Sequence, residues 1–263
     1  MHKTKSEFEN IYKEHYNKLF NVAYHITGNK EDAEDSLQEA YLNAYKAFST
    51  FHEQSSISTW LYRITVNSSL KLIKKRKTLL ITDFAAKDNV SELELLDKLK
   101  SAESVENTVI VNDIREMCLN MFLNCMPRKQ RITFVLKVLL QMSVNEVSLI
   151  MNISKEAVKV NVYRAKQLMK ENIGERCSLI NPNNPCKCNL WIKYIYDNNL
   201  QSKLPVTGII DVNHDYVSLV NSEIDFVSKL IRIYNTHPAH LSSTEFIDKM
   251  KEIILNKNLK IFS

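Results

Sequence analysis

The chain has 263 residues, enough for one large domain or about two to three small ones. Only 3 glycines and 5 prolines are present and 44% of the residues are apolar, so scarce turn formers favour an all-α fold. The net charge of +5 is modest, but basic and acidic clusters are segregated. No apolar run approaches the ~20 residues of a membrane span, and the start lacks the apolar stretch of a secretory signal. We therefore expect a cytoplasmic protein without membrane insertion, with reduced cysteines.

Two helices are expected at the start of the chain. The first covers residues 7–26 and ends near Gly28, which suits a left-handed helix cap. The second covers residues 30–48, and its first turn holds acids that the helix dipole favours: Glu31, Asp32, Glu34 and Asp35. Its apolar stripe follows a helical period: Leu37, Tyr41, Ala44 and Phe48. This stripe predicts which side of the helix packs on the protein.

A polar loop over residues 51–57 leads to a third expected helix, capped by Ser58 or Thr59. Trp60, Arg63 and Asn67 share one side of this helix. Residues 71–77 then place five positive charges in seven residues, a surface suited to phosphates. Residues 78–107 are richer in acids and lack a strong period, so we expect a linker that is partly disordered or transiently helical.

A second helical module is expected over residues 108–171, with one helix ending at Pro127. Ser143 and Glu146 form a capping box, Asn152 suits a left-handed turn, and Ser154 caps the next helix. That next helix has an inward apolar stripe: Val158, Val162, Ala165 and Met169. Its outward side is basic and aromatic: Lys155, Lys159, Tyr163, Arg164 and Lys166. This two-sided pattern is typical of a helix-turn-helix that reads the major groove of DNA.

The segment 31–67 resembles region two of bacterial sigma factors, in the extracytoplasmic-function (ECF) group of the sigma-70 family. The resemblance depends on Ala33-Glu34-Asp35, Gln38-Glu39-Ala40, Phe51, Thr59-Trp60-Leu61-Tyr62-Arg63-Ile64 and Asn67. The helix-turn-helix resembles region four of the same family through Pro127, Gln130-Arg131, Glu146, Ile153-Ser154, Val158-Lys159 and Arg164-Ala165-Lys166. The resemblance covers residues 7–171, about two thirds of the chain.

The resemblance implies a sigma factor that binds core RNA polymerase, through its beta and beta-prime subunits, and directs promoter recognition. The polymerase-binding residues would be Asp35, Gln38, Glu39, Tyr41 and Leu42. The residues at the minus-ten element would be Phe51, Gln54, Ser55, Ser56, Trp60, Arg63, Asn67, Lys71 and Lys74. The residues at the minus-thirty-five element would be Ser154, Lys155, Lys159, Asn161, Tyr163, Arg164 and Lys166. Asn161 departs from the family, which often has a basic residue at this position.

Four segments follow from this interpretation. Residues 1–77 correspond to region two, 78–107 to the linker, 108–173 to region four, and 174–263 to a C-terminal extension. In the resembling proteins the linker threads near the polymerase active site. The extension is expected to include an amphipathic segment over Trp191–Leu200 and helices over 217–235 and 243–259. We expect a regulatory tail that packs on the sigma modules or receives an inhibitor such as an anti-sigma factor.

The extension begins with three cysteines within twelve residues, Cys177, Cys186 and Cys188. A structural zinc site needs four ligands, so a fourth would come from elsewhere, with His214, His237 and His240 as candidates. A redox pair that involves Cys177 and an unligated turn are the other two interpretations. No cofactor is required for the sigma function, and zinc is the one cofactor that the sequence raises.

Two other function classes compete with the sigma interpretation. A free-standing helix-turn-helix regulator would bind duplex DNA alone, but it leaves the order of residues 33–67 unexplained. A zinc-dependent enzyme would use the cysteine cluster, but the sequence offers no plausible general base or pocket motif. We therefore expect a protein with no catalytic residues.

Overall fold

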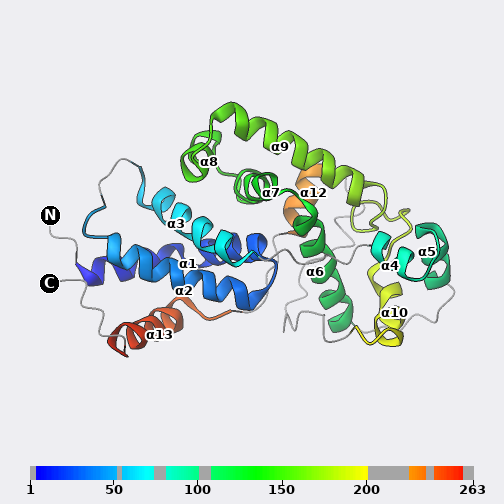
Figure 1. The fold of residues 1–263 in the computed structure, drawn as a ribbon, viewed down its shortest axis with the longest axis horizontal. Helices are drawn as coiled ribbons and strands as arrows, with labels where there is room; N and C mark the ends of the chain where they lie inside the picture. The colour runs from blue at the N-terminus through cyan, green and yellow to red at the C-terminus, as the bar shows by residue number, and fades with distance from the viewer. Residues whose placement is uncertain are drawn as a thin grey trace.

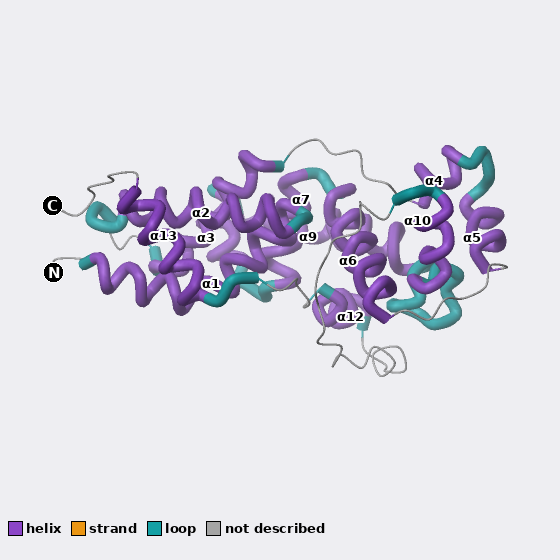
Figure 2. Tube along the Cα trace, turned by 90° about the horizontal axis from the view of Figure 1, so that it is seen from below, coloured by secondary structure: helices purple, strands orange, loops and turns teal. Residues whose placement is uncertain are grey.

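The computed structural model describes residues 4–51, 55–73, 81–100, 108–200, 225–234 and 240–256. Across these ranges the chain is built from helices, and the β-structure is limited to an isolated bridge between Cys177 and Cys186. The all-α expectation is confirmed. The molecule is elongated, with α1, α2, α3 and α13 at one end and α4, α5 and α10 at the other (Figure 1; Figure 2). None of the helices within the described ranges is both long and apolar enough to cross a membrane.

The first module packs α1 (Lys5–Thr27), α2 (Lys30–Ala47) and α3 (Ile57–Leu72) around an aromatic core. Gly28 has φ of 84°, the left-handed cap expected from the sequence. The aromatic rings of this core are in close contact: the Tyr41 centroid lies 4.8 Å from that of Tyr12 and 5.1 Å from that of Phe8. One boundary expectation is wrong. Ser56 caps α3, because its hydroxyl oxygen accepts the Thr59 backbone N–H at 3.2 Å, so the helix begins before Ser58.

The second module consists of α6 (Thr108–Cys125), α7 (Arg128–Phe134), a π-helical turn (Val135–Leu139), α8 (Val144–Met151) and α9 (Lys155–Met169). The expected caps are confirmed. Ser143 and Glu146 form a reciprocal capping box, and Asn152 has φ of 52° at the end of α8. Ser154 accepts the Ala157 backbone N–H at 3.1 Å and so caps α9. These local hydrogen bonds fix the turn between α8 and α9.

Residues assigned to the linker form packed structure instead. Helices α4 (Ile81–Lys87) and α5 (Glu92–Lys100) bury Phe84, Leu95 and Leu96 against α6 and α10 (Trp191–Asp197). The expectation of a disordered or transiently helical linker is therefore wrong for these two helices. Each helix is too short to be stable alone, and contacts with distant Trp191 supply the apolar surface that the local sequence lacks.

Two helices of the C-terminal extension return to the two modules. Helix α12 (Phe226–Ile233) packs on the second module, and α13 (Ser243–Asn256) packs on α1. The expected packing of the tail on the sigma-like modules is confirmed for these two helices. The part of the expected 217–235 helix before residue 225 lies outside the described residues, as do residues 257–259 of the other.

Candidate nucleic-acid interface

Helix α9 presents its basic side to solvent. Val158, Ala165 and Met169 are buried against the second module, which turns the opposite side outward. Its exposed residues are Lys155, Lys159, Tyr163 and Arg164, while Asn161 and Lys166 are half-buried. Ser154 is exposed, but its oxygen already serves the helix cap. A helix with this division of charge and an accessible long axis suits insertion into a major groove.

Two residues of this face were missing from the sequence interpretation. Glu156 and Val160 are exposed, and Val160 has 46% of its surface accessible. Their positions continue the spacing of three and four that joins Lys159 to Tyr163, so the helical period alone contained this signal. An exposed apolar residue among basic neighbours offers contact with a thymine methyl group, and a carboxylate can accept a hydrogen bond from cytosine.

Helix α3 carries four of the residues assigned to the minus-ten element: Trp60, Arg63, Asn67 and Lys71. The rings of Phe51 and Trp60 lie 4.9 Å apart, which forms an aromatic surface of the kind on which unpaired bases stack. Asn67 and Lys71 are exposed further along α3, and Ser55 is half-buried before its cap. Gln54 and Lys74 lie outside the described residues.

Part of this side of α3 is covered by the second module. Arg63 Nη2 donates to the Leu149 carbonyl oxygen at 2.6 Å, near the C-terminal end of α8. Arg128 Nη2 donates to the Ile73 carbonyl oxygen at 3.0 Å, just beyond the end of α3. Apolar residues of both modules belong to one continuous buried cluster, which includes Val66 and Ile150. No sequence pattern indicated this contact, because its partners lie more than fifty positions apart.

Tyr62, also on α3, is nearly buried at the same contact. Burial, with a smaller contribution from the Glu146 carboxylate of α8, raises the pKa of Tyr62 to about 12. The phenol therefore stays neutral at physiological pH. The structure brings Tyr62 and Arg63 against α8, whereas Asn67 remains accessible.

The exposed side of α2 holds four of the five residues assigned to polymerase binding. Asp35 is exposed, and Gln38, Glu39 and Leu42 are half-exposed. Glu39 is not free, because its carboxylate accepts a hydrogen bond from Lys71. Tyr41 is a correction: it is fully buried in the aromatic core and does not present a side chain to a partner in this structure. The apolar stripe of the helix correctly predicted that Tyr41 packs in the core, whereas the family motif suggested a contact with the polymerase.

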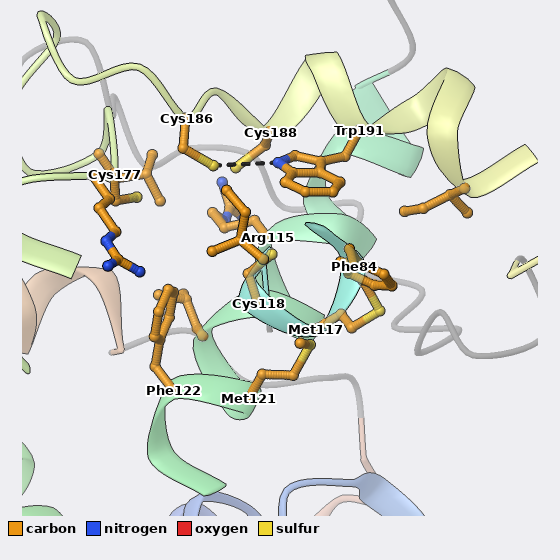
Figure 3. Close-up of a pocket in the computed structure, with 15 residues that line it drawn as sticks. Phe84, Arg115, Met117, Cys118, Met121, Phe122, Cys177, Cys186, Cys188 and Trp191 are labelled. Atoms are coloured by element: carbon orange, nitrogen blue, oxygen red, sulfur yellow. Dashed lines mark hydrogen bonds between the residues drawn. The ribbon is translucent and has the colours of Figure 1, made fainter. Parts of the chain in front are cut away.

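The three clustered cysteines line a cavity of about 60 Å³, which α6 completes with Cys118 (Figure 3). The bridge between Cys177 and Cys186 folds the loop, and Trp191 Nε1 donates to Cys186 Sγ at 3.2 Å. Burial raises the pKa of Cys177 to about 11, and that of Cys188 is raised further. All five cysteines are free thiols, so the redox pair is not formed here. Cys118 was expected only as a small buried hydrophobe.

Of the three candidates for the fourth zinc ligand, only His240 lies within the described residues, and it is not at this cavity. His240 stacks on Phe20 of α1 with ring centroids 3.9 Å apart, while His214 and His237 lie outside the described residues. Within the described ranges, no three or more His, Cys, Asp or Glu side chains are placed to hold a metal ion. Zinc binding at Cys177, Cys186 and Cys188 stays a prediction of the sequence.

Comparison with known proteins places these two modules in one family. The family model for Sigma-70 region 2 matches residues 11–78, and the model for Sigma-70 region 4 matches residues 116–169. The chain is 28% identical over 172 residues to the ECF RNA polymerase sigma factor SigW of Bacillus subtilis, covering 64% of this chain and 88% of that protein. It is 27% identical over 143 residues to the ECF RNA polymerase sigma-E factor of Escherichia coli K12, covering 54% of this chain and 74% of that protein.

A solved structure of the sigma factor RpoE in complex with the anti-sigma factor NepR from Bartonella quintana is also similar. It has a TM-score of 0.44 and 20% sequence identity, and covers 63% of this chain and 95% of that chain. The region 2 match includes α2 and α3, and the region 4 match includes the helix-turn-helix of α8 and α9. Residues 11–78 and 116–169 therefore carry the two sigma-70 regions, and the chain is similar to ECF sigma factors.

Proposed function

We propose that this protein is a promoter-specificity subunit that binds core RNA polymerase and directs the initiation of transcription. The observation that carries this proposal is the presence of sigma-70 regions 2 and 4, in that order, in one chain. A DNA-binding regulator needs only the second of these regions. The acidic, exposed side of α2 and the basic side of α9 agree with contacts to polymerase and to DNA respectively.

We propose a separate role for each of the described surfaces. Asp35, Gln38, Glu39 and Leu42 on α2 dock on the polymerase through charge-assisted hydrogen bonds and apolar contact. Phe51 and Trp60 stack on the separated strand at the minus-ten element. The basic side of α9 reads the minus-thirty-five element. Each contact alone is weak, and the polymerase joins them into one multivalent grip.

The chain thus contributes recognition, and we propose no catalytic activity of its own. Its site of action is the cytoplasm, where the polymerase and the promoter are found. The segment boundaries proposed for these roles are 1–77 for region two, 78–107 for the connection, 108–173 for region four and 174–263 for the extension.

Run-off transcription with purified core polymerase on fragmented genomic DNA tests the function. New start sites that share two upstream elements are expected only when the protein is added. The double variant Asp35→Ala/Gln38→Ala should reduce these transcripts strongly. Glu14→Ala removes an exposed carboxylate from α1 and is the matched control. No new start sites, together with no binding to core polymerase, would refute the proposal.

The second candidate function is a helix-turn-helix regulator that acts without polymerase. The accessible basic side of α9 is the observation that favours it. Tight, sequence-specific binding of duplex DNA by the free chain at physiological salt would support this alternative. The sigma proposal expects such binding to be weak until the polymerase is present.

A further inference from the structure

We propose that residues 225–256 act as a strap that keeps the two DNA-reading modules together in the free protein, and that one end of this strap must detach when both promoter elements are bound. The inference rests on the proposed function and adds a control step to it. It follows from the places of α12 and α13, from the length of chain between them, and from the contact between α3 and α8.

Helix α12 anchors one end of the strap in the second module. Leu230 and Ile233 are buried in a cluster with residues of α6, α7 and α9, which include Phe134 and Met169. One hydrogen bond adds to this anchor, because the Tyr234 hydroxyl donates to the Leu119 carbonyl of α6 at 2.8 Å. Lys229 Nζ also donates, at 2.9 Å, to the carbonyl of Ile180, which is part of the extension and packs in the same apolar cluster. This end of the strap is tied to the module by both apolar and polar contacts.

Helix α13 anchors the other end in the first module. Phe246, Ile247, Met250 and Ile254 are buried on one side of it. The Phe246 ring centroid lies 4.7 Å from that of Tyr16 and 5.9 Å from that of Tyr12, so it belongs to the aromatic core of α1 and α2. At the edge of this contact Lys251 Nζ lies 3.4 Å from a Glu9 carboxylate oxygen. The opposite side of α13 is exposed, with Leu255 at 71%.

The chain between the two anchors is short. Helix α12 ends at Ile233 and α13 begins at Ser243, so ten steps along the chain separate them. Fully extended, these steps reach at most about 36 Å. The minus-ten and minus-thirty-five elements lie about 25 base pairs apart by definition, or about 85 Å along straight B-DNA. With both helices docked, the strap restrains the separation that simultaneous reading of the two elements requires.

In the structure with both ends of the strap docked, α3 is partly covered by α8. While the modules stay together, the Arg63 guanidinium is bonded to the Leu149 carbonyl oxygen of α8 and is not available to a DNA strand. The side of α2 that is proposed to dock on polymerase is left accessible by α13, because Asp35 and Gln38 keep solvent exposure. The free protein is therefore open to polymerase, while the part of the minus-ten surface around Arg63 becomes available only after the modules separate.

A strap variant tests the inference in the full-length chain. Phe246→Ala/Met250→Ala truncates two of the four buried side chains that hold α13, and Leu255→Ala on the same helix is the matched control. The probe is a fluorescein-labelled single strand of mixed sequence, about 20 nucleotides long. If the separated state is under ~10% populated, the strap variant should bind the probe at least about tenfold more tightly than the wild type. Adding Arg63→Ala should remove this gain, and small-angle scattering should show a larger radius of gyration.

An unchanged affinity and radius in a strap variant whose α13 amides exchange freely would overturn the inference. A measurement on the wild-type chain covers the case in which the variant does not fold. Hydrogen exchange over residues 225–233 and 243–256 is compared in the free protein, bound to core polymerase, and bound to polymerase on a promoter fragment recovered by genomic run-off. Loss of protection at one of the two helices in the promoter complex is expected, and full protection of both would refute the strap. Binding to core polymerase is measured on the same samples, so a failure of the sigma function is recognised separately.

Discussion

Helices α3 and α9 both carry residues assigned to promoter DNA, yet they differ in how free those residues are. Helix α9 uses one apolar stripe to pack on its own module and leaves its basic side in solvent. Helix α3 packs on two sides: Leu61 and Ser69 are buried within its own module, while Val66 and Arg63 meet the second module. The difference indicates that the residues proposed to read the minus-thirty-five element are accessible in the free protein, whereas Arg63, proposed for the minus-ten element, is released only if α8 moves away from α3.

The largest effect is expected from Lys159→Ala on the open helix. Loss of one good contact to a base costs about 1–3 kcal/mol, so promoter affinity of the polymerase complex should fall by about 5- to 150-fold. The measurement is the dissociation constant on a promoter fragment at fixed salt. Lys187→Ala, an exposed lysine of the extension, is the control and should leave the affinity unchanged. Equal effects of both substitutions would mean that α9 acts only through its general charge.

An intermediate effect is expected in hydroxyl-radical footprinting of two tyrosines. Tyr163 on α9 is 64% exposed and Tyr62 on α3 is 7% exposed, so the free chain should oxidise several-fold faster at Tyr163. Binding to polymerase and promoter should raise the rate at Tyr62 relative to the free chain, because α8 leaves it. An unchanged rate at Tyr62 in that complex would contradict the proposed opening.

The same contact predicts a response to alkali. The folded pKa of Tyr62 is raised to about 12, above an ordinary value of 10.0, because burial favours the neutral phenol. The stabilisation is fully present below the ordinary pKa and is lost as pH rises through the folded value. Urea unfolding should therefore show a loss of stability between these pH values that is smaller in Tyr62→Phe. An identical pH dependence in both proteins would show that Tyr62 is exposed before unfolding.

The smallest effect is expected from the cap of α8, the helix that covers α3. Ser143→Ala removes the hydroxyl that accepts the Glu146 backbone N–H at 3.2 Å, and should cost about 0.5–2 kcal/mol in the free energy of unfolding. Hydrogen bonds from Ser143 lower the pKa of Glu146, so the carboxylate side of this box is lost as pH falls through that lowered value. Urea unfolding at neutral and acidic pH measures both effects. Asn145→Ala, an exposed neighbour, is the control, and equal losses in the two variants would show that the cap contributes nothing specific.

Features that depend on neighbouring residues could be predicted from the sequence. The capping box at Ser143, the left-handed residues Gly28 and Asn152, and the two-sided pattern of α9 were all predicted, because each rests on hydrogen bonds or periodicity within a few positions. The resemblance to sigma-70 regions 2 and 4 could also be recognised in the sequence, because it depends on the order and spacing of motifs along the chain.

The accessibility of these surfaces, and the packing of the remaining segments, depend on contacts between distant parts of the chain. Tyr41 is buried although the motif suggested a contact, α4 and α5 fold although their local pattern is weak, and Cys118 joins a cavity with cysteines about sixty positions away. The contacts of α3 with α8 and of α13 with α1 belong to the same class. Such contacts form between apolar side chains that are far apart in the sequence. Local propensity and periodicity carry no information about which distant residues will meet.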